Sequence, residues 1–146
     1  MNHRNAAPRR ALLIDFENML FESARLADYG LVADRLIRTV ETAGPVHHRL
    51  LVARPWALKQ HLELFIALRL PIAVAPRGRD GADHVLLDRG RFLAGHGFTE
   101  FSIASRDHIF ADFAAAHPTD VIVPTPHSVS RALVRAARRL IVLSPN

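Results

Sequence analysis

Three acidic residues follow short apolar runs, at points where the strands of an α/β sheet would end. Asp15 ends the apolar run 11–14, and Asn18 follows three residues later. Asp83 and Asp107 each come shortly after another such run. Because residues just beyond the carboxyl ends of parallel strands line one crevice, the pattern predicts that these three carboxylates gather at one edge of a sheet. Carboxylates gathered without a counter-charge repel one another, so the arrangement predicts a bound divalent cation.

The chemistry that such a site would support is the hydrolysis of phosphodiester bonds. Mg²⁺ and Mn²⁺ prefer hard oxygen ligands, which Asp15, Asp83 and Asp107 would supply. A cation held there can polarise a phosphodiester, stabilise charge on the transferring phosphoryl group and lower the pKa of a water nucleophile. Arginine side chains around the site would contact the flanking phosphates.

Each acid taken alone also has a structural explanation. Asp15 stands where a helix cap is common, and Asp107 fits the first turn of a helix. Asp80 and Asp83 fit the cap and first-turn positions of another helix, where its dipole favours negative charge. A structural role is the simpler interpretation of any single acid, whereas the recurrence at three strand ends favours a shared functional site.

Apolar runs alternate with helical patterns along the chain, and this alternation predicts the elements that position the acids. Six strands are expected, at 11–14, 50–53, 72–75, 101–104, 121–123 and 140–143. Several of these runs are continuously apolar, as expected of strands covered on both faces. The alternation therefore predicts a three-layer, Rossmann-like α/β sandwich with a mainly parallel central sheet.

Five helices are expected between the strands, each marked by apolar residues at helical spacing. The first ends at Gly44-Pro45, the second has Pro55 in its first turn, and Asp80 is expected to cap the third. Ser128 is the expected cap of the last helix. The apolar positions are, in chain order, Val32, Leu36, Ile37 and Val40; Leu58, Leu62, Phe65 and Ile66; Val85, Leu86, Leu87, Phe92 and Leu93; Ile109, Phe110, Phe113 and Ala114; and Val129, Leu133, Val134 and Ala137.

Charge and composition limit the partners. The 146 residues carry a formal net charge of +5, and Lys59 is the only lysine, so 18 of the 19 basic residues are arginines. Arginine binds phosphate in bidentate geometry, which points to a polyanionic partner such as RNA, although coding bias is an alternative explanation of the arginine content. Without cysteine, the chain has no disulfide, thiolate zinc site or cysteine nucleophile.

No segment of the sequence is expected to enter a membrane. Every apolar run is interrupted by charge well short of about 18 residues. The apolar stretch after Arg9-Arg10 is broken at once by Asp15, unlike a signal peptide, so a cytoplasmic protein is expected. Residues 1–10 are expected to form a flexible basic tail, and residues 11–146 a single domain.

Four segments, which follow one another in order, carry a family resemblance. They are Ile14-Asp15-Phe16-Glu17-Asn18, Gly81-Ala82-Asp83 preceded by Arg79, the segment 103–110, and the segment 128–143. The first resembles the opening I-D-x-x-N motif of NYN domains, a branch of the PIN-like ribonucleases. The second and third resemble the family's glycine-containing second motif and its strand followed by S-G-D-x-D-F, and the last is similar to its closing helix and strand.

The resemblance implies a PIN-like fold and cleavage of RNA that depends on Mg²⁺ or Mn²⁺. The site residues that it implies are Asp15, Asp83 and Asp107 as metal-ligating catalytic acids, Asn18 as a residue that assists the site or orients substrate, and Arg79 and Arg106 as contacts to the RNA backbone. A homo-oligomer or a partner protein is compatible with the same sequence.

The chain departs from the family in the third motif, where Ile109 replaces a second aspartate and Arg106 replaces a glycine. Loss of that carboxylate should weaken metal binding or leave a site for a single ion, unless Asp112 replaces it. A catalytically impaired RNA-binding or protein-interaction module on the same fold is therefore an alternative. A phosphotransfer enzyme is a further alternative, although Asp15 lacks the D-x-D nucleophile arrangement expected of one.

Overall fold

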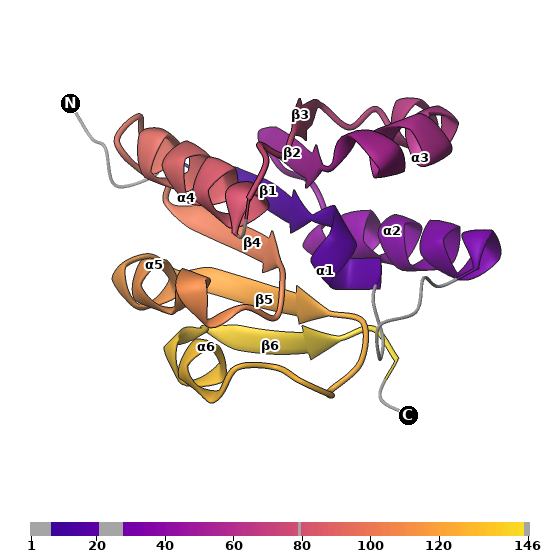
Figure 1. Ribbon diagram of the computed structural model, residues 1–146. Helices are drawn as coiled ribbons and strands as arrows, with labels where there is room; N and C mark the ends of the chain where they lie inside the picture. Colours follow the sequence, from indigo (N-terminus) through magenta and orange to yellow (C-terminus); the bar gives the residue numbers. More distant parts are fainter. Residues whose placement is uncertain (1–6, 21–27, 79, 145–146) are drawn as a thin grey trace.

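Six strands form one parallel sheet in the computed structural model, which describes residues 7–20, 28–78 and 80–144. The strands are β1 (Arg10–Asp15), β2 (His48–Ala53), β3 (Ile72–Val74), β4 (Glu100–Ala104), β5 (Thr119–Val123) and β6 (Arg139–Val142). Their spatial order is β3-β2-β1-β4-β5-β6, and every neighbouring pair is parallel (Figure 1). The expected parallel sheet is confirmed, and its strand order is that of the doubly wound Rossmann fold.

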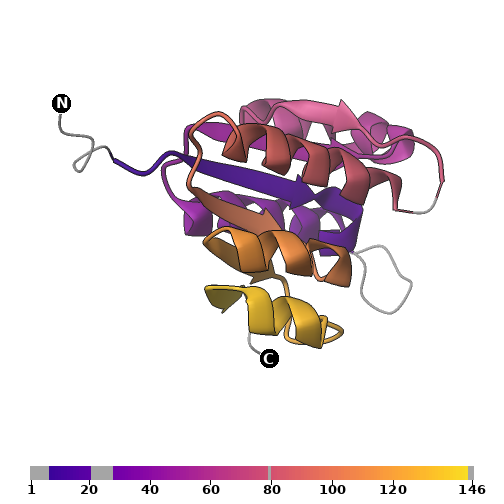
Figure 2. The same ribbon diagram turned by 90° about the vertical axis from the view of Figure 1, so that its left-hand side faces the viewer.

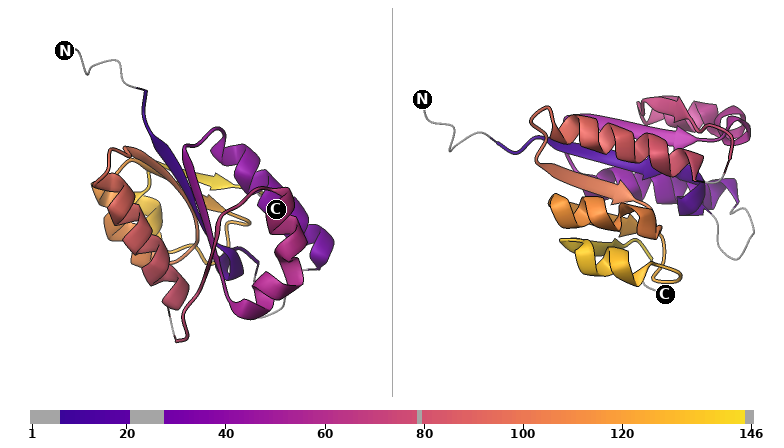
Figure 3. Two further views of the ribbon diagram at one scale, coloured as in Figure 1. Left: turned by 90° about the horizontal axis from the view of Figure 1, so that it is seen from above. Right: turned by 60° about the vertical axis from the view of Figure 1, so that its left-hand side comes forward.

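Helices cover both faces of the sheet, which gives the expected three layers when the molecule is seen from above (Figure 3). One layer contains α1 (Phe16–Leu20), α2 (Tyr29–Ala43) and α3 (Pro55–Ala67). The other contains α4 (Gly81–Ala94), the 3₁₀ helix η2 (His108–Phe110), α5 (Ala111–Ala116) and α6 (Arg131–Ala136), with α4, α5 and α6 side by side in Figure 2. No described helix is long and apolar enough to cross a membrane.

Two apolar cores result from the alternation of side chains along the strands. In the central strand β1, Leu13 packs with the layer of α4, α5 and α6, whereas Leu12 and Ile14 pack with the layer of α1, α2 and α3. All three side chains are fully buried. Coverage on both faces therefore explains why the strands are continuously apolar in sequence.

The second predicted helix, α3, exposes two of the residues expected in its core stripe. Leu62 and Ile66 face solvent, Ile66 with 63% of its surface exposed. The buried side of α3 consists instead of Ala57, Leu64 and Phe65, together with a histidine at position 61. Both faces of this helix carry apolar residues, so the sequence periodicity did not distinguish the buried side from the exposed one.

The two ends of the chain also differ in detail from the sequence pattern. Strand β1 begins at Arg10, and the guanidinium carbon of Arg9 lies 4.6 Å from the centre of the Phe98 ring, so part of the expected tail packs on the fold. The last helix is capped by Ser130, whose hydroxyl oxygen accepts a hydrogen bond from the backbone N–H of Leu133, rather than by Ser128.

The strand order reverses between β1 and β4, and such a reversal creates a crevice at the carboxyl ends of the strands. The chain proceeds from β1 outward to β2 and β3, and then returns through α4 to β4 on the other side of β1. Ligands of open α/β sheets bind at such a switch point, beyond the carboxyl ends of the strands. Asp15 is the last residue of β1, and Asp107 follows the end of β4 by three residues.

The opposite edge of the sheet is held by a network of ion pairs. Asp120 of β5 is only 4% exposed, and its oxygens accept hydrogen bonds from Arg138 at 3.0 Å and from Arg139 at 2.8 Å. Arg138 also donates to Glu100 of β4 at 2.6 Å, and Glu100 in turn accepts from Arg10 of β1 at 2.8 Å. The network therefore links four neighbouring strands at their amino ends.

We expect Asp120→Asn to lower the free energy of unfolding at pH 7 by about 2 kcal/mol. Burial alone would raise the pKa of Asp120, but hydrogen bonds from Arg138 and Arg139 outweigh it and lower the pKa to about 2. Because this value lies below the ordinary pKa of 3.8, the carboxylate stabilises the fold above about pH 4 and loses this effect as the pH falls toward 2. The difference between variant and wild type should therefore shrink over that interval in urea titrations, whereas Asp112→Asn, at an exposed acid, should change little at any pH.

Candidate metal centre

A cleft of about 460 Å³ opens at the carboxyl ends of β1 and β4. It is lined by Asp15, Glu17, Asn18, Arg54, Trp56, Asp80, Gly81, Ala82, Asp83, Arg106 and Asp107. The four residues that the sequence motifs indicated as catalytic, Asp15, Asn18, Asp83 and Asp107, therefore meet in one cleft, together with Arg106. They come from three different parts of the chain, so the fold brings them together rather than the local sequence.

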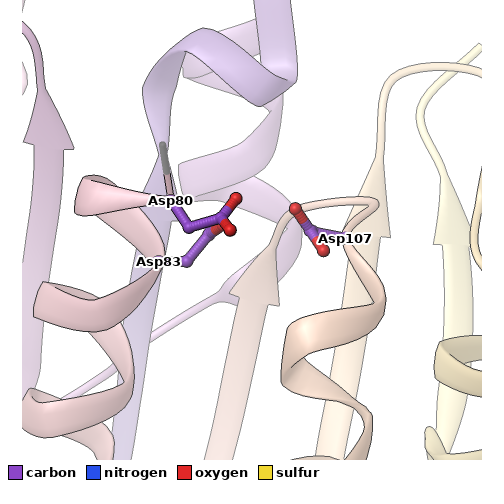
Figure 4. Close-up of side chains that lie close together, drawn as sticks. All are labelled: Asp80, Asp83 and Asp107. Carbon is purple, nitrogen blue, oxygen red and sulfur yellow. The ribbon is translucent and has the colours of Figure 1, made fainter. Parts of the chain in front are cut away.

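Three carboxylates from two elements converge at the floor of this cleft (Figure 4). Asp80 and Asp83 stand at the start of α4, and Asp107 stands in the turn between β4 and η2. One oxygen of each lies within 4.8 Å of the chosen oxygens of the other two. These three residues could hold a metal ion, because carboxylate oxygens bind one ion at about 2.0 to 2.6 Å each.

Asp15 adjoins this group through Asp83. The carboxyl group of Asp83 lies close enough to Asp15 to raise its pKa. The sequence motifs indicated Asp15, Asp83 and Asp107 as the acidic set, and the structure adds Asp80 to it. The cleft therefore contains four aspartates, of which Asp83 contacts members on both sides.

Asp80 joins the group because of an unusual local backbone. It occupies the cap position of α4 with φ 62° and ψ 17°, in the left-handed region, and its side chain makes no capping hydrogen bond. Aspartate tolerates this conformation better than most residues. The next residue must be glycine, because a Cβ on Gly81 would lie 2.4 Å from the backbone oxygen of Pro76. This close approach sets the start of α4, so that Asp80 turns its carboxylate toward Asp83 and Asp107.

Asp83 is the most confined acid of the cluster. Only 4% of its surface is exposed, and its Oδ1 atom has no hydrogen-bond partner among the described residues. Burial raises the pKa of Asp83, and the charges of Asp107 and Asp80 raise it further, to about 6, although a hydrogen bond with Asp15 counteracts part of the shift. Burial and the contact with Asp83 also raise the pKa of Asp15 well above its ordinary value. A buried carboxylate oxygen without a donor could bind a cation.

Asn18 holds the segment that carries Asp107. Its side-chain oxygen accepts a hydrogen bond from the backbone N–H of Arg106 at 2.7 Å, which ties α1 to the turn after β4. The backbone N–H of Asp107 in turn donates to the hydroxyl of Ser105 at 3.2 Å. One oxygen of Asp107 accepts the backbone N–H of Ile109 at 3.0 Å, so this acid is itself the cap of η2. Asp107 therefore caps a helix with one oxygen and also belongs to the acidic group that could hold a metal ion.

The remaining sequence candidates lie outside the acidic group. Ile109 packs against the core beneath α4, α5 and α6, so position 109 contributes no ligand. Asp112 is exposed on α5 and does not replace the missing acid of the third motif, whereas Asp80 adds a carboxylate from a different element. Arg106 lines the cleft, and Arg79 lies outside the described residues.

Sequence reasoning did not place Asp80, Glu17, Arg54 or Trp56 in the site. A side-chain oxygen of Glu17 accepts a hydrogen bond from the backbone N–H of Arg54, which fixes the turn between β2 and α3 against α1. This contact brings the start of α3, with Arg54 and Trp56, to the cleft. The signal available in sequence was the position of these residues just after β2, a third strand whose carboxyl end faces the same edge.

Comparison with known proteins identifies the fold but not a family. No family model matches the chain, and no curated protein is significantly similar to it. A crystal structure of a protein of unknown function from Vibrio parahaemolyticus is similar to this structure, with a TM-score of 0.70. The two are 15% identical, and the similarity covers 98% of this chain and 97% of that one. At this identity the likeness supports the architecture over the whole chain and carries no information on activity.

We expect Asp83→Asn to raise the free energy of unfolding of the metal-free protein at pH 7 by about 1 to 3 kcal/mol, since it removes a buried carboxylate from among other acids. The folded pKa of Asp83, about 6, lies above its ordinary value of 3.8, so the wild type regains stability as the pH falls through 6 toward 4. The advantage of the variant should therefore shrink from pH 7 to pH 4 in urea titrations. A variant less stable than the wild type at pH 7 would show that Asp83 makes a stabilising contact instead.

Proposed function

We propose that the protein is a metal-dependent ribonuclease of the NYN or PIN-like type, which cleaves RNA phosphodiester bonds with Mg²⁺ or Mn²⁺. The observation that carries this proposal is the meeting of Asp80, Asp83 and Asp107, with a buried and unpartnered oxygen on Asp83. The resemblance of four ordered sequence segments to the NYN motifs supports the same assignment.

The donor set fits a hard divalent cation. All available ligands are carboxylate oxygens, and the cleft contains no cysteine because the chain has none. Carboxylates favour Mg²⁺ and Mn²⁺ over metals that prefer sulfur or imidazole. A bound cation would also neutralise the repulsion that raises the pKa of Asp83, so the free energy that the cluster costs in the metal-free protein favours cation binding.

The residues of the cleft have distinct tasks in this proposal. Asp80, Asp83 and Asp107 hold the cation, which when bound lowers the pKa of a water and stabilises negative charge on the phosphoryl group. Asp15 lies against Asp83 and can accept or hold a proton beside the reacting water. Asn18 keeps Asp107 in place through the backbone of Arg106. Arg106, which lines the cleft, contacts a phosphate of the bound strand in this proposal.

The charge of the molecule suits an RNA substrate. The chain has a net charge of +5, yet this cleft concentrates aspartates. The net positive charge attracts RNA, whereas the aspartates of the cleft can bind RNA only through a metal ion. In the sequence analysis, the isoleucine at position 109 in place of an acid was the feature that favoured the alternative, a binding module without activity. The carboxylate that Asp80 adds makes an active enzyme the better-supported function.

We expect the purified protein to cleave a fluorescently labelled single-stranded RNA in the presence of Mn²⁺, and to lose this activity on chelation with EDTA. Asp83→Asn should reduce the cleavage rate by about a hundredfold or more, because it removes the central carboxylate of the cluster. Asp88→Asn is the matched control, an exposed acid on the same helix, and should cleave like the wild type.

Two results would contradict the proposal. Cleavage that persists in EDTA, or that is equally fast in Asp83→Asn, would rule out this metal centre. RNA binding in Mn²⁺ without any turnover would identify the protein as a binding module with an inactive site.

A further inference from the structure

One part of the cleft lining, which we call the wall, has a different character from the acids. Arg54 and Trp56 line it, at the start of α3, whereas the aspartates come from β1, α4 and the turn after β4. Trp56 is the only tryptophan of the chain and retains 38% of its surface exposed. Tryptophan is usually well buried on average, so a partly exposed one that lines a polar cleft is unlike a core residue.

We propose that this wall is a subsite for one nucleotide of a single-stranded nucleic acid, with the base stacked on Trp56 and the adjacent phosphate bound by Arg54. The inference rests on the proposed function, because it assumes that the acids of the same cleft act on a neighbouring phosphodiester. An aromatic face binds a base only if the base is unstacked from its neighbours, which is the condition in single strands and not in duplexes.

Two backbone features fix the start of α3, which carries Trp56. Pro55 stands in the first turn of α3, where its restricted φ angle suits a helix start. The hydrogen bond from the backbone N–H of Arg54 to Glu17 anchors the same turn to α1. Because Arg54 takes part through its backbone, its exposed side chain has no task in this anchor. The subsite is therefore held rigidly relative to Asp15, whose strand runs directly into α1.

A second hollow continues the cleft on the other side of the acids. It has a volume of about 310 Å³ and is lined by Asn18, Arg106, Asp107, His108, Ser128 and Ser130. Asn18, Arg106 and Asp107 line both hollows, so the two adjoin at the metal centre. A strand that starts on Trp56 can thus cross the carboxylates and continue past Arg106 toward the hydroxyl groups of Ser128 and Ser130. Hydroxyl and guanidinium donors are suited to phosphate and ribose contacts.

The single tryptophan makes the subsite directly measurable. Asp83→Asn protein, which should leave the strand intact, is titrated with an eight-nucleotide single-stranded RNA while the tryptophan fluorescence is recorded. We expect saturable quenching, which disappears when one nucleotide, at a single position along the strand, is replaced by an abasic unit. The same RNA in duplex form should cause little quenching.

Variants of the wall give a second readout, the affinity for labelled RNA measured by fluorescence anisotropy. Trp56→Ala should weaken binding about 5- to 150-fold, and Trp56→Phe should retain most of the affinity, because one stacked base contributes about 1 to 3 kcal/mol. Arg54→Ala should weaken binding and reduce its dependence on salt. The control is Phe92→Ala, an aromatic residue that is 58% exposed near the far end of α4 and stacks on His96, and its affinity should be unchanged.

The outcomes separate this inference from the proposed function. If RNA binds and is cleaved by the wild type but leaves the emission of Trp56 unchanged, the subsite is refuted and the ribonuclease stands. If quenching and the loss of affinity in Trp56→Ala occur but the wild type cleaves nothing, the subsite stands and the ribonuclease is refuted. The subsite would be overturned, whatever the activity, if duplex RNA quenched equally. It would also be overturned if quenching stayed the same wherever the abasic unit stands in the strand. Should Trp56→Ala fail to fold, Arg54→Ala and the abasic series on unchanged Trp56 still decide the question.

Discussion

Repulsion among confined carboxylates is the constraint on which the functional edge of this protein depends. Asp83 and Asp15 are nearly inaccessible to water, and burial is the largest cause that raises the pKa of each. Asp83 raises the pKa of Asp15 further, whereas Asp107 and Asp80 raise that of Asp83. Such a cluster costs folding free energy until a proton or a cation neutralises it. The two apolar cores, one on each face of the sheet, supply the stability that offsets this cost, because the central strands β1 and β4 are buried on both faces. Because these cores stabilise the fold, the protein can retain clustered acids that contribute no stability of their own.

Local packing keeps the carboxylates together despite their repulsion. The contact of Gly81 with the backbone of Pro76 sets the start of α4, and Asn18 ties the turn that carries Asp107 to α1. Neither contact uses an oxygen of the three clustered acids, so both can persist when a cation binds. The acids are therefore positioned in advance of binding, and little reorganisation is required of the metal-free protein.

The sequence predicted the architecture and three of the four acids for one reason, and missed the fourth for another. Asp15, Asp83 and Asp107 follow strand-like runs, and the carboxyl ends of parallel strands share an edge whatever the details of the loops. Asp80 looked like a helix cap because it occupies the cap position. Its contribution depends on a left-handed backbone and on the contact of Gly81 with Pro76, and both are tertiary properties. Trp56 was not assigned to the site for the same reason, since the contact between Glu17 and Arg54 links segments 37 residues apart.

A comparison within the molecule shows how partners can add to or overcome the effect of burial on an aspartate. Asp120 and Asp83 are each 4% exposed, at opposite edges of the same sheet. Two arginines lower the pKa of Asp120 to about 2, whereas neighbouring acids contribute to raising that of Asp83 to about 6. The oxygens of Asp120 accept hydrogen bonds from the protein's own arginines and so link neighbouring strands, and this acid needs no ligand. Asp83 has an oxygen with no partner in the described chain, and a proton or a metal ion could satisfy it. In a chain with 18 arginines, this edge gathers acids that could hold a cation, and that observation carries the proposed function.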